Sequence, residues 1–441
     1  MKKRRLLPFL ALLAALLLSG CAMRTIDELY TPPKRSEEYS RLQSAIDIAM
    51  AGLEYSAPLT GENQQAVQMA DLNGDGVEEY LVFARGNSDK PMQILIFNQE
   101  EDGNVEITEV ITSTGTAFEL VQYAEIDGKP GVELVVGRQV SDQLMGSACV
   151  YSFSGGRAER LVNAGYSKLI TLDLGGSEQK ELLLIQRGES DQANAVAVLY
   201  RYRAKSMVRS VEVELSHPAA SVKRVSAGKM QCGTPAVYVS LATEQNAIIT
   251  DILALKGESL KKVSVQDALD GAVHTLGNYY VYAEDVDDDG VMELPDLIPV
   301  QPVSANWKQE EQYLIRWYSL DLEGNQHDKL HSFHNYADGW YLKLDSRWTS
   351  QLTVYQVGST YVFYMWNEDF REATAVFTIY ALSGSDRQTQ STDDGRFVLY
   401  SSDDVIYAAR LESDLSEYGI TESYLINSFS LIHRDWNTGE T

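Results

Sequence analysis

The feature that most constrains the fold is a nine-residue loop with oxygen-bearing side chains at alternate positions. One copy spans residues 71–79 and contains Gly76, and a second spans residues 285–293 and contains Gly290. A hard cation such as Ca²⁺ takes six to eight oxygen ligands, which a tight loop with an oxygen at every second residue can supply. Glycine permits the positive φ angle that such a turn needs. Two copies in one chain predict an internal repeat.

Aligning the chain on these loops gives a period of about 50 residues. Loop-like segments begin at residues 71, 125, 173, 226 and 285, so the intervals are 54, 48, 53 and 59 residues. A strand-like run follows each loop, and we expect three more strands before the next loop. Four strands in this length are typical of a β-propeller blade. The sequence therefore predicts a mainly β chain, with a propeller of five or more four-stranded blades over residues 64–337.

Outside this region the pattern changes. Residues 22–35 are proline-containing and aperiodic, which indicates a tether, and residues 36–53 have helical spacing. After residue 338 the period is lost, although strand-like runs continue and Thr421 is a helix-cap candidate. We predict a separate small α+β domain over residues 338–441. One or two further irregular blades are the alternative.

The two oxygen loops resemble the FG-GAP/VCBS-type repeats of integrin-like propellers and bacterial surface proteins. The resemblance covers about residues 64–337 and implies a propeller whose loops bind structural Ca²⁺. The ligands it implies are Asp71, Asn73, Asp75, the Val77 carbonyl and Glu79, and in the second copy Asp285, Asp287, Asp289, the Val291 carbonyl and Glu293. The other three units lack this set, so we predict no metal there and expect turns alone to order their loops.

Two other interpretations of these loops stay open. Acids and glycines are also common in solvated turns. An EF-hand-like or dockerin-like loop would carry an acid at its twelfth position, which is Val82 in the first copy and Asp296 in the second. Helices flank such loops, whereas strand-like runs follow here, and this favours the propeller interpretation.

The N-terminus predicts export and lipidation. Four basic residues precede an apolar run over residues 6–18, which is too short to span a bilayer comfortably. The run ends in Leu18-Ser19-Gly20-Cys21, which resembles a bacterial lipobox. We therefore predict a signal peptide over residues 1–20, a lipidated Cys21, and an anchor, tether and short helix over residues 21–63. The expected location is a bacterial cell membrane, with the protein facing outward; an ordinary secretory signal is the alternative.

The charge of the chain excludes one class of partner. The precursor has a net charge of −26, and removal of the four basic residues in the leader gives −30. Such a surface repels nucleic acid and anionic lipids, and it attracts divalent cations. No nucleic-acid partner is predicted.

Cysteine and histidine give weaker signals. Cys149 and Cys232 could pair in an exported protein, but we favour two buried, unpaired side chains. His327, His331 and His334 lie near several aromatic residues and could hold a transition metal. An HExxH pattern is missing, however, and a strand there would not place all three histidines on one face. The neighbouring aromatics could stack on a sugar or form core.

Two functional hypotheses follow. Nucleophile-elbow, P-loop and dinucleotide-binding motifs are missing from the sequence. We therefore favour a non-enzymatic binding or scaffolding module with structural calcium, whose partner is an unknown surface protein or polysaccharide. The alternative is a polysaccharide-acting enzyme with its site at the propeller mouth or the domain seam. A pair of carboxylates about 5–9 Å apart would favour the enzyme.

Overall fold

The computed structural model describes residues 37–99, 103–140, 145–245, 247–263, 275–276, 279–303, 311–412 and 418–433. The predicted signal peptide, Cys21 and the predicted tether all lie outside these residues. The predicted helix is present as α3 (Glu37–Ala49). No helix in the described part of the chain is both long and apolar enough to cross a membrane.

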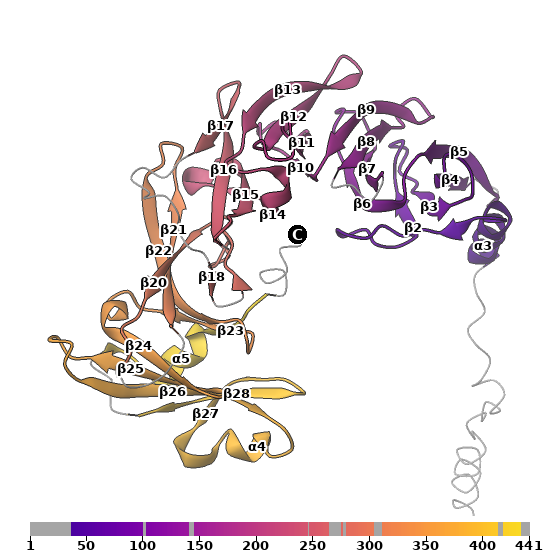
Figure 1. Cartoon of the computed structure of the whole chain (residues 1–441). Coiled ribbons are helices and arrows are strands. Elements are labelled where there is room, and N and C mark those ends of the chain that lie inside the picture. Colours follow the sequence, from indigo (N-terminus) through magenta and orange to yellow (C-terminus); the bar gives the residue numbers. More distant parts are fainter. Residues whose placement is uncertain are drawn as a thin grey trace, which may run out of the picture.

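Six antiparallel sheets of four or five strands follow one another along the chain, as in the blades of a propeller, which confirms the predicted fold class (Figure 1). The first sheet contains β1 (Glu54–Tyr55), β2 (Val67–Ala70), β3 (Glu79–Arg85), β4 (Met92–Gln99) and β5 (Val105–Ser113). The second contains β6 (Ala117–Ala124), β7 (Glu133–Gln139), β8 (Gly146–Ser152) and β9 (Glu159–Tyr166). The third contains β10 (Lys168–Leu172), β11 (Glu181–Gln186), β12 (Val196–Arg203) and β13 (Ser206–Glu214).

The later sheets are more varied. The fourth contains β14 (Val222–Lys229), β15 (Pro235–Ala242), β16 (Ile248–Lys256) and β17 (Ser259–Val263). A short pair, β18 (Thr275–Leu276) and β19 (Tyr279–Tyr280), precedes the fifth sheet of β20 (Leu294–Pro299), β21 (Tyr313–Leu320), β22 (Gln326–Asn335), β23 (Trp340–Leu344) and β29 (Phe429–Leu431). The sixth contains β24 (Leu352–Val357), β25 (Thr360–Trp366), β26 (Ala373–Ser383), β27 (Phe397–Ser401) and β28 (Val405–Leu411), with α4 (Arg387–Gln390) between β26 and β27.

In the first four sheets the strand before each loop belongs with the strands after it. The sequence interpretation expected that strand to close the preceding unit. Instead, β6 pairs with β7 across the loop at residues 125–132, and β10 pairs with β11 in the same way. The spacing of hydrophobic residues is the same whether the strand belongs to the sheet before the loop or to the sheet after it. Only strand pairing decides where each repeat begins.

Residues after 338 complete one sheet and build another. The predicted boundary falls between β22 and β23, which pair within the fifth sheet. After the sixth sheet, α5 (Glu422–Ser428) leads into β29, which pairs with β23. Thr421 caps α5 as predicted, because its side chain accepts a hydrogen bond from the Tyr424 N–H. Whether residues 338–441 fold independently stays a prediction, but their core is shared with the fifth sheet.

Each sheet packs on the next through a shared hydrophobic cluster. Separate clusters join the first and second sheets, the second and third, the third and fourth, the fourth and fifth, and the fifth and sixth. No cluster among the described residues joins the sixth sheet to the first. Figure 1 shows the same arrangement as an open arc with these two sheets at its ends. The fold is therefore propeller-like, with an open ring.

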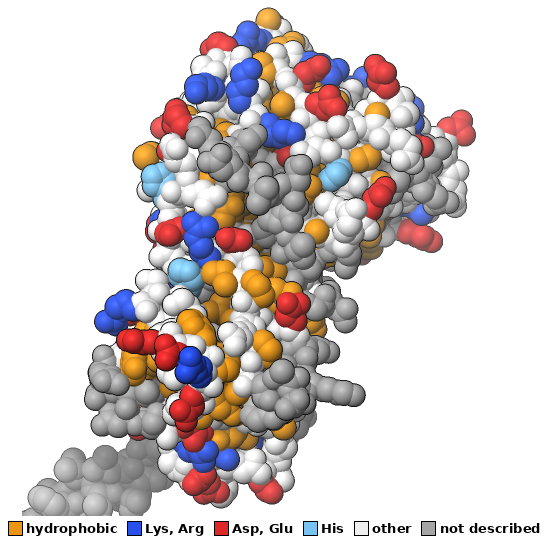
Figure 2. Space-filling model, turned by 60° about the vertical axis from the view of Figure 1, so that its left-hand side comes forward, with side chains coloured by type: hydrophobic (Ala, Val, Ile, Leu, Met, Phe, Trp, Pro, Cys, Tyr) orange, Lys and Arg blue, Asp and Glu red, His pale blue; other side chains and the backbone are white. Residues whose placement is uncertain are grey.

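The two ends of the arc are finished differently. On the first sheet, α3 covers the outer face, where Ile46 packs against Val82, Leu95 and Phe97. On the sixth sheet, Val357, Phe370 and Tyr400 are exposed. In Figure 2, hydrophobic side chains gather in the lower half of the view, at the height of the sixth sheet in Figure 1. A terminal repeat must hide its outer apolar face, and α3 does this at the first end.

The contact between α3 and the first sheet can be tested with two neighbouring isoleucines. Ile46 is 4% exposed, whereas Ile48 is 78% exposed on the same helix. We expect Ile46→Ala to lower the free energy of unfolding by about 2–5 kcal/mol, because it leaves a cavity under the helix. Ile48→Ala should change it by less than about 0.5 kcal/mol. Chemical denaturation of both variants measures this, and equal losses would contradict the capping role of α3.

Candidate functional site

The candidate site consists of the oxygen loops, which all lie at the same end of their sheets. In the first sheet the loop joins β2 and β3, and in the second and third sheets it joins the first and second strands. In the fifth sheet the loop is closed by the bridge between Glu284 and Glu293, just before β20. Since strands alternate in direction, the connections β3–β4, β7–β8 and β11–β12 lie at the opposite end. The arc therefore has an oxygen-loop face and a second, opposite face.

A buried glutamate ends each of four loops and accepts a backbone hydrogen bond from seven residues earlier. The glutamates are Glu79, Glu133, Glu181 and Glu293, all less than 9% exposed. Their donors are the N–H groups of Leu72, Ile126, Leu174 and Val286, at 2.8, 2.7, 2.7 and 3.1 Å. Each donor residue is a buried apolar one. The loop is thus fastened at both ends, one by apolar burial and one by a carboxylate.

This finding corrects one expectation. The second and third loops were expected to be ordered by turns alone, yet Glu133 and Glu181 fasten them as the glutamates of the metal-type loops do. The sequence signal was present: an acid stands eight residues after Glu125 and after Asp173, as it does after Asp71 and Asp285. In the first and fifth loops this glutamate was assigned as a metal ligand, so its shared structural position in all four loops was not recognised.

Adjacent loops are also joined to each other by backbone hydrogen bonds. The N–H of Val132 donates to the carbonyl of Asp71 at 3.1 Å, and that of Lys180 donates to Glu125 at 2.7 Å. At the fifth loop, the N–H of Met292 donates to Lys229 at 2.8 Å. Three neighbouring pairs of sheets are therefore linked through this face as well as through their cores.

The first loop is built around its own backbone. Asp71 accepts from the N–H groups of Gly74 and Gly76 at 2.7 and 2.9 Å, and Asp75 accepts from Val77 at 2.8 Å. A Cβ on Gly74 would lie 2.3 Å from the carbonyl carbon of Pro130 in the second loop, so close approach requires glycine there. Gly76 has a φ of +88° and open space around it, as the turn argument predicted.

The fifth loop brings its predicted ligands together. Oxygen atoms of Asp285, Asp287 and Asp289 all lie within 4.8 Å of one another. Glu293 is fully buried beside them, and its Oε1 has no hydrogen-bond partner. Burial, with the neighbouring charges of Asp287 and Asp289, raises the pKa of Glu293 to about 7, although the bond from Val286 opposes this. An all-oxygen set that includes a buried carboxylate oxygen without a hydrogen bond suits a hard divalent cation.

A lysine also enters the fifth loop. The Lys329 ammonium donates to Asp289 and lies 3.8 Å from Glu293 Oε1. The hydrogen bond from Lys329 lowers the pKa of Asp289. The sequence interpretation missed this residue because it lies on β22, far from the loop along the chain.

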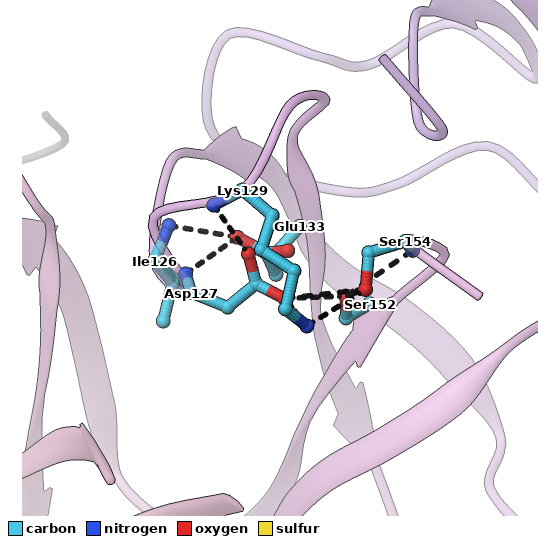
Figure 3. Close-up of polar contacts among 6 residues, drawn as sticks. All are labelled: Ile126, Asp127, Lys129, Glu133, Ser152 and Ser154. Atoms are coloured by element: carbon cyan, nitrogen blue, oxygen red, sulfur yellow. Dashed lines mark hydrogen bonds and ion pairs between the residues drawn. The ribbon is translucent and has the colours of Figure 1, made fainter. Parts of the chain in front are cut away.

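The second and third loops hold a basic side chain in place of further oxygens. In the second loop, Lys129 Nζ is 2.8 Å from Asp127 Oδ2 and 2.9 Å from Ser154 Oγ, while Glu133 accepts from two backbone N–H groups (Figure 3). In the third loop, Arg201 Nε donates to Glu181 Oε1 at 2.9 Å. These contacts provide positive charge beside the buried acids without a metal.

The histidines do not converge. His327 is exposed near Asp321, His331 is half-buried and His334 is buried among aromatic rings, although all three lie on β22. The expectation that one strand would separate them is confirmed.

Cys149 is buried and free, as favoured, but Cys232 is exposed, which corrects that part of the prediction. Cys232 lies in the 3₁₀ turn Gln231–Gly233, which replaces the oxygen loop in the fourth sheet.

The opposite face carries a separate pocket of about 800 Å³ at the seam of the third and fourth sheets. Its lining combines apolar residues, among them Pro218, Ala242 and Ile249, with polar and charged ones, among them Gln192, Thr243, Gln245, Asp191, Glu244 and His217. The ring atom Nε2 of His217 is buried without a hydrogen-bond partner. The His217 carbonyl accepts from Ala195 N–H at 2.9 Å, which fixes that wall. The volume is within the usual range for small-ligand sites.

Comparison with known proteins leaves the family open. No protein-family profile and no curated protein sequence matches this chain. A similar solved structure is a protein from Lactobacillus plantarum, with a TM-score of 0.33 and 11% identity, covering 72% of this chain and 85% of that one. We draw no functional inference from a similarity at this level. The FG-GAP/VCBS relationship stays a prediction.

The fastening role of the loop glutamates gives a direct test in the second loop, which has no predicted metal. Glu133→Ala leaves the N–H groups of Ile126 and Asp127 without their acceptor. We expect it to lower the free energy of unfolding by about 2–4 kcal/mol, since each unsatisfied buried donor costs about 1–3 kcal/mol. Glu159→Ala, at an exposed site on β9, is the matched control. Similar losses in the two variants by urea denaturation would refute the fastening role.

Proposed function

We propose that this protein is a lipid-anchored, outward-facing binding module of a bacterial cell surface, with Ca²⁺ as a structural ion in the first and fifth oxygen loops. The observation that carries the calcium proposal is the fifth loop, where three aspartates converge beside buried Glu293, whose Oε1 accepts no hydrogen bond. Asp71, Asn73, Asp75, the Val77 carbonyl and Glu79 would hold the ion in the first loop. The anchor rests on the lipobox-like sequence before Cys21.

A structural role for the ion follows from where the loops lie. Backbone hydrogen bonds join the first loop to the second and the fifth to the fourth. An ion that orders a loop would therefore also hold neighbouring sheets together. An open arc has no ring closure to restrain its sheets, so bonds between neighbours carry more of the stability.

The opposite face supports the binding part of the proposal. The pocket at the seam of the third and fourth sheets has carboxylates from Asp191 and Glu244 in its lining and no lysine or arginine among the described lining residues. Arg187 pairs with Asp191 at 2.6 Å, so Glu244 carries the charge in the lining that disfavours phosphate and carboxylate ligands. Neutral amides, a hydroxyl and the His217 imidazole can each donate or accept hydrogen bonds. The chemistry fits an uncharged, hydroxyl-rich unit, such as one sugar of a polysaccharide.

Calcium should stabilise the mature chain. A ligand that binds only the folded state adds RT ln(1 + [L]/Kd), so about 5 mM Ca²⁺ with a Kd of about 0.1–1 mM gives about 1–2 kcal/mol per loop. We expect a corresponding rise in the melting temperature of residues 22–441, measured by calorimetry against a chelator. Asp75→Ala combined with Asp289→Ala should abolish the rise.

A matched control separates loop binding from general charge effects. Asp89→Ala combined with Asp369→Ala removes the same charge from two exposed sites outside the loops. This variant should retain the calcium-dependent rise. A wild-type chain whose melting temperature ignores millimolar Ca²⁺ would refute the calcium proposal and favour ordinary acidic turns.

The pocket can be tested with sugar probes. We expect N-acetyl-D-glucosamine, D-glucose or D-galactose at millimolar concentration to give saturation-transfer NMR signals with the wild-type chain. Glucose 6-phosphate should bind more weakly than glucose, because the Glu244 carboxylate repels its phosphate. His217→Ala should weaken binding, whereas His327→Ala, on β22 and outside the pocket, should not. The absence of signal from all three neutral sugars would refute this ligand class.

A further inference from the structure

Lys329 reaches the fifth loop because of a β-bulge. In the pairing of β21 with β22, Trp317 lies opposite Leu330 and Tyr318 lies opposite Asp328, so that Lys329 is the extra residue. Bulges re-aim a side chain out of the regular alternation of a strand. The Lys329 side chain is only 17% exposed and contacts two acids of the loop.

The same bulge recurs in the first three sheets, where β4 pairs with β5, β8 with β9 and β12 with β13. The extra residues there are Thr108, Leu161 and Ser210. In each case an aromatic residue marks the register shift on the neighbouring strand, as Tyr318 does in the fifth sheet. The bulge is therefore a feature of the repeat, and a basic residue in it is particular to the fifth sheet.

Basic side chains elsewhere on this face accompany loops that lack a ligand set. Lys129 serves the second loop and Arg201 the third. In the first loop, Asn73 Nδ2 donates to Glu79 Oε1 at 2.6 Å, and among the described residues no lysine or arginine forms an ion pair with Asp71, Asp75 or Glu79. The fifth loop alone combines a full oxygen set with a lysine.

We propose that Lys329 is a built-in counter-ion of the fifth loop, which a divalent cation must displace from Asp289 and Glu293 in order to bind. This inference rests on the proposed calcium function and deepens it. The first loop then binds Ca²⁺ more tightly than the fifth. As Ca²⁺ rises, the first loop fills first, and the fifth exchanges its lysine for the ion only at higher concentration.

The physical reason is competition for the same oxygens. While Asp289 accepts a hydrogen bond from the Lys329 ammonium, its carboxylate is not fully available to coordinate a metal ion. The buried Oε1 of Glu293 lies 3.8 Å from that ammonium, so the lysine already compensates part of its charge. A resident cation also repels an incoming one.

Calorimetric titration of Ca²⁺ into residues 22–441 tests this. In Asp75→Ala, which removes a first-loop ligand, the fifth loop is the remaining site. We expect Lys329→Met in that background to lower the Kd at least about tenfold, which corresponds to about 1.4 kcal/mol. Lys329→Gln removes the charge but keeps a polar side chain, and it serves as a second variant should the methionine variant fold poorly.

Lys343→Met is the matched control, because it removes one lysine from β23 in the same sheet. It should leave the Kd unchanged. An equal Kd with and without Lys329, or an equal gain from Lys343→Met, would overturn the counter-ion role while leaving the calcium proposal intact. If neither the wild-type chain nor any variant binds Ca²⁺, the calcium proposal fails, and the counter-ion role fails with it.

Discussion

Much of this structure depends on one constraint, which is that a buried carboxylate must be satisfied. A glutamate closes each of four loops and is taken almost out of water. Burying such a group is costly unless it is hydrogen-bonded and its charge is compensated. The backbone N–H from seven residues earlier provides the common bond. The group that compensates the remaining negative charge of the glutamate differs from loop to loop, and this difference decides which loops can bind a metal ion.

The loops and the hydrophobic cores both hold neighbouring sheets together. Each sheet buries one face against each neighbour, and the loop face adds backbone bonds between neighbours. In a closed propeller the first and last blades would also restrain each other. This arc lacks that contact among its described residues, so α3 covers the first sheet and β29 ties the region of the sixth sheet back to the fifth. Contacts between neighbouring elements therefore take the place of ring closure in this chain.

The sequence was sufficient for those features that repeat locally. Strand periodicity and the oxygen loops predicted a mainly β, blade-like fold, because alternation and turn chemistry act over a few residues. The phase of the repeat was wrong by one strand, since pairing across a loop leaves no local signal. Lys329 was missed for a similar reason: a bulge on β22 aims it at a loop that ends 36 residues earlier, by subtraction from Glu293. Cys232 was misplaced because the fourth repeat replaces its loop with a turn.

The repeats therefore share a scaffold and differ in the cation that completes it. Lysine or arginine compensates the acids of the second and third loops. In the first loop an asparagine bonds the glutamate, and no basic partner is found among the described residues. The fifth loop has both a full set of oxygen ligands and a lysine. A fixed ammonium gives constant stability, whereas an exchangeable metal makes stability depend on the surroundings. Under the proposed calcium function, the first and fifth loops would respond to Ca²⁺, whereas Lys129 and Arg201 already compensate the second and third loops. The effect of Ca²⁺ on stability would then be largest in the sheets that carry the first and fifth loops.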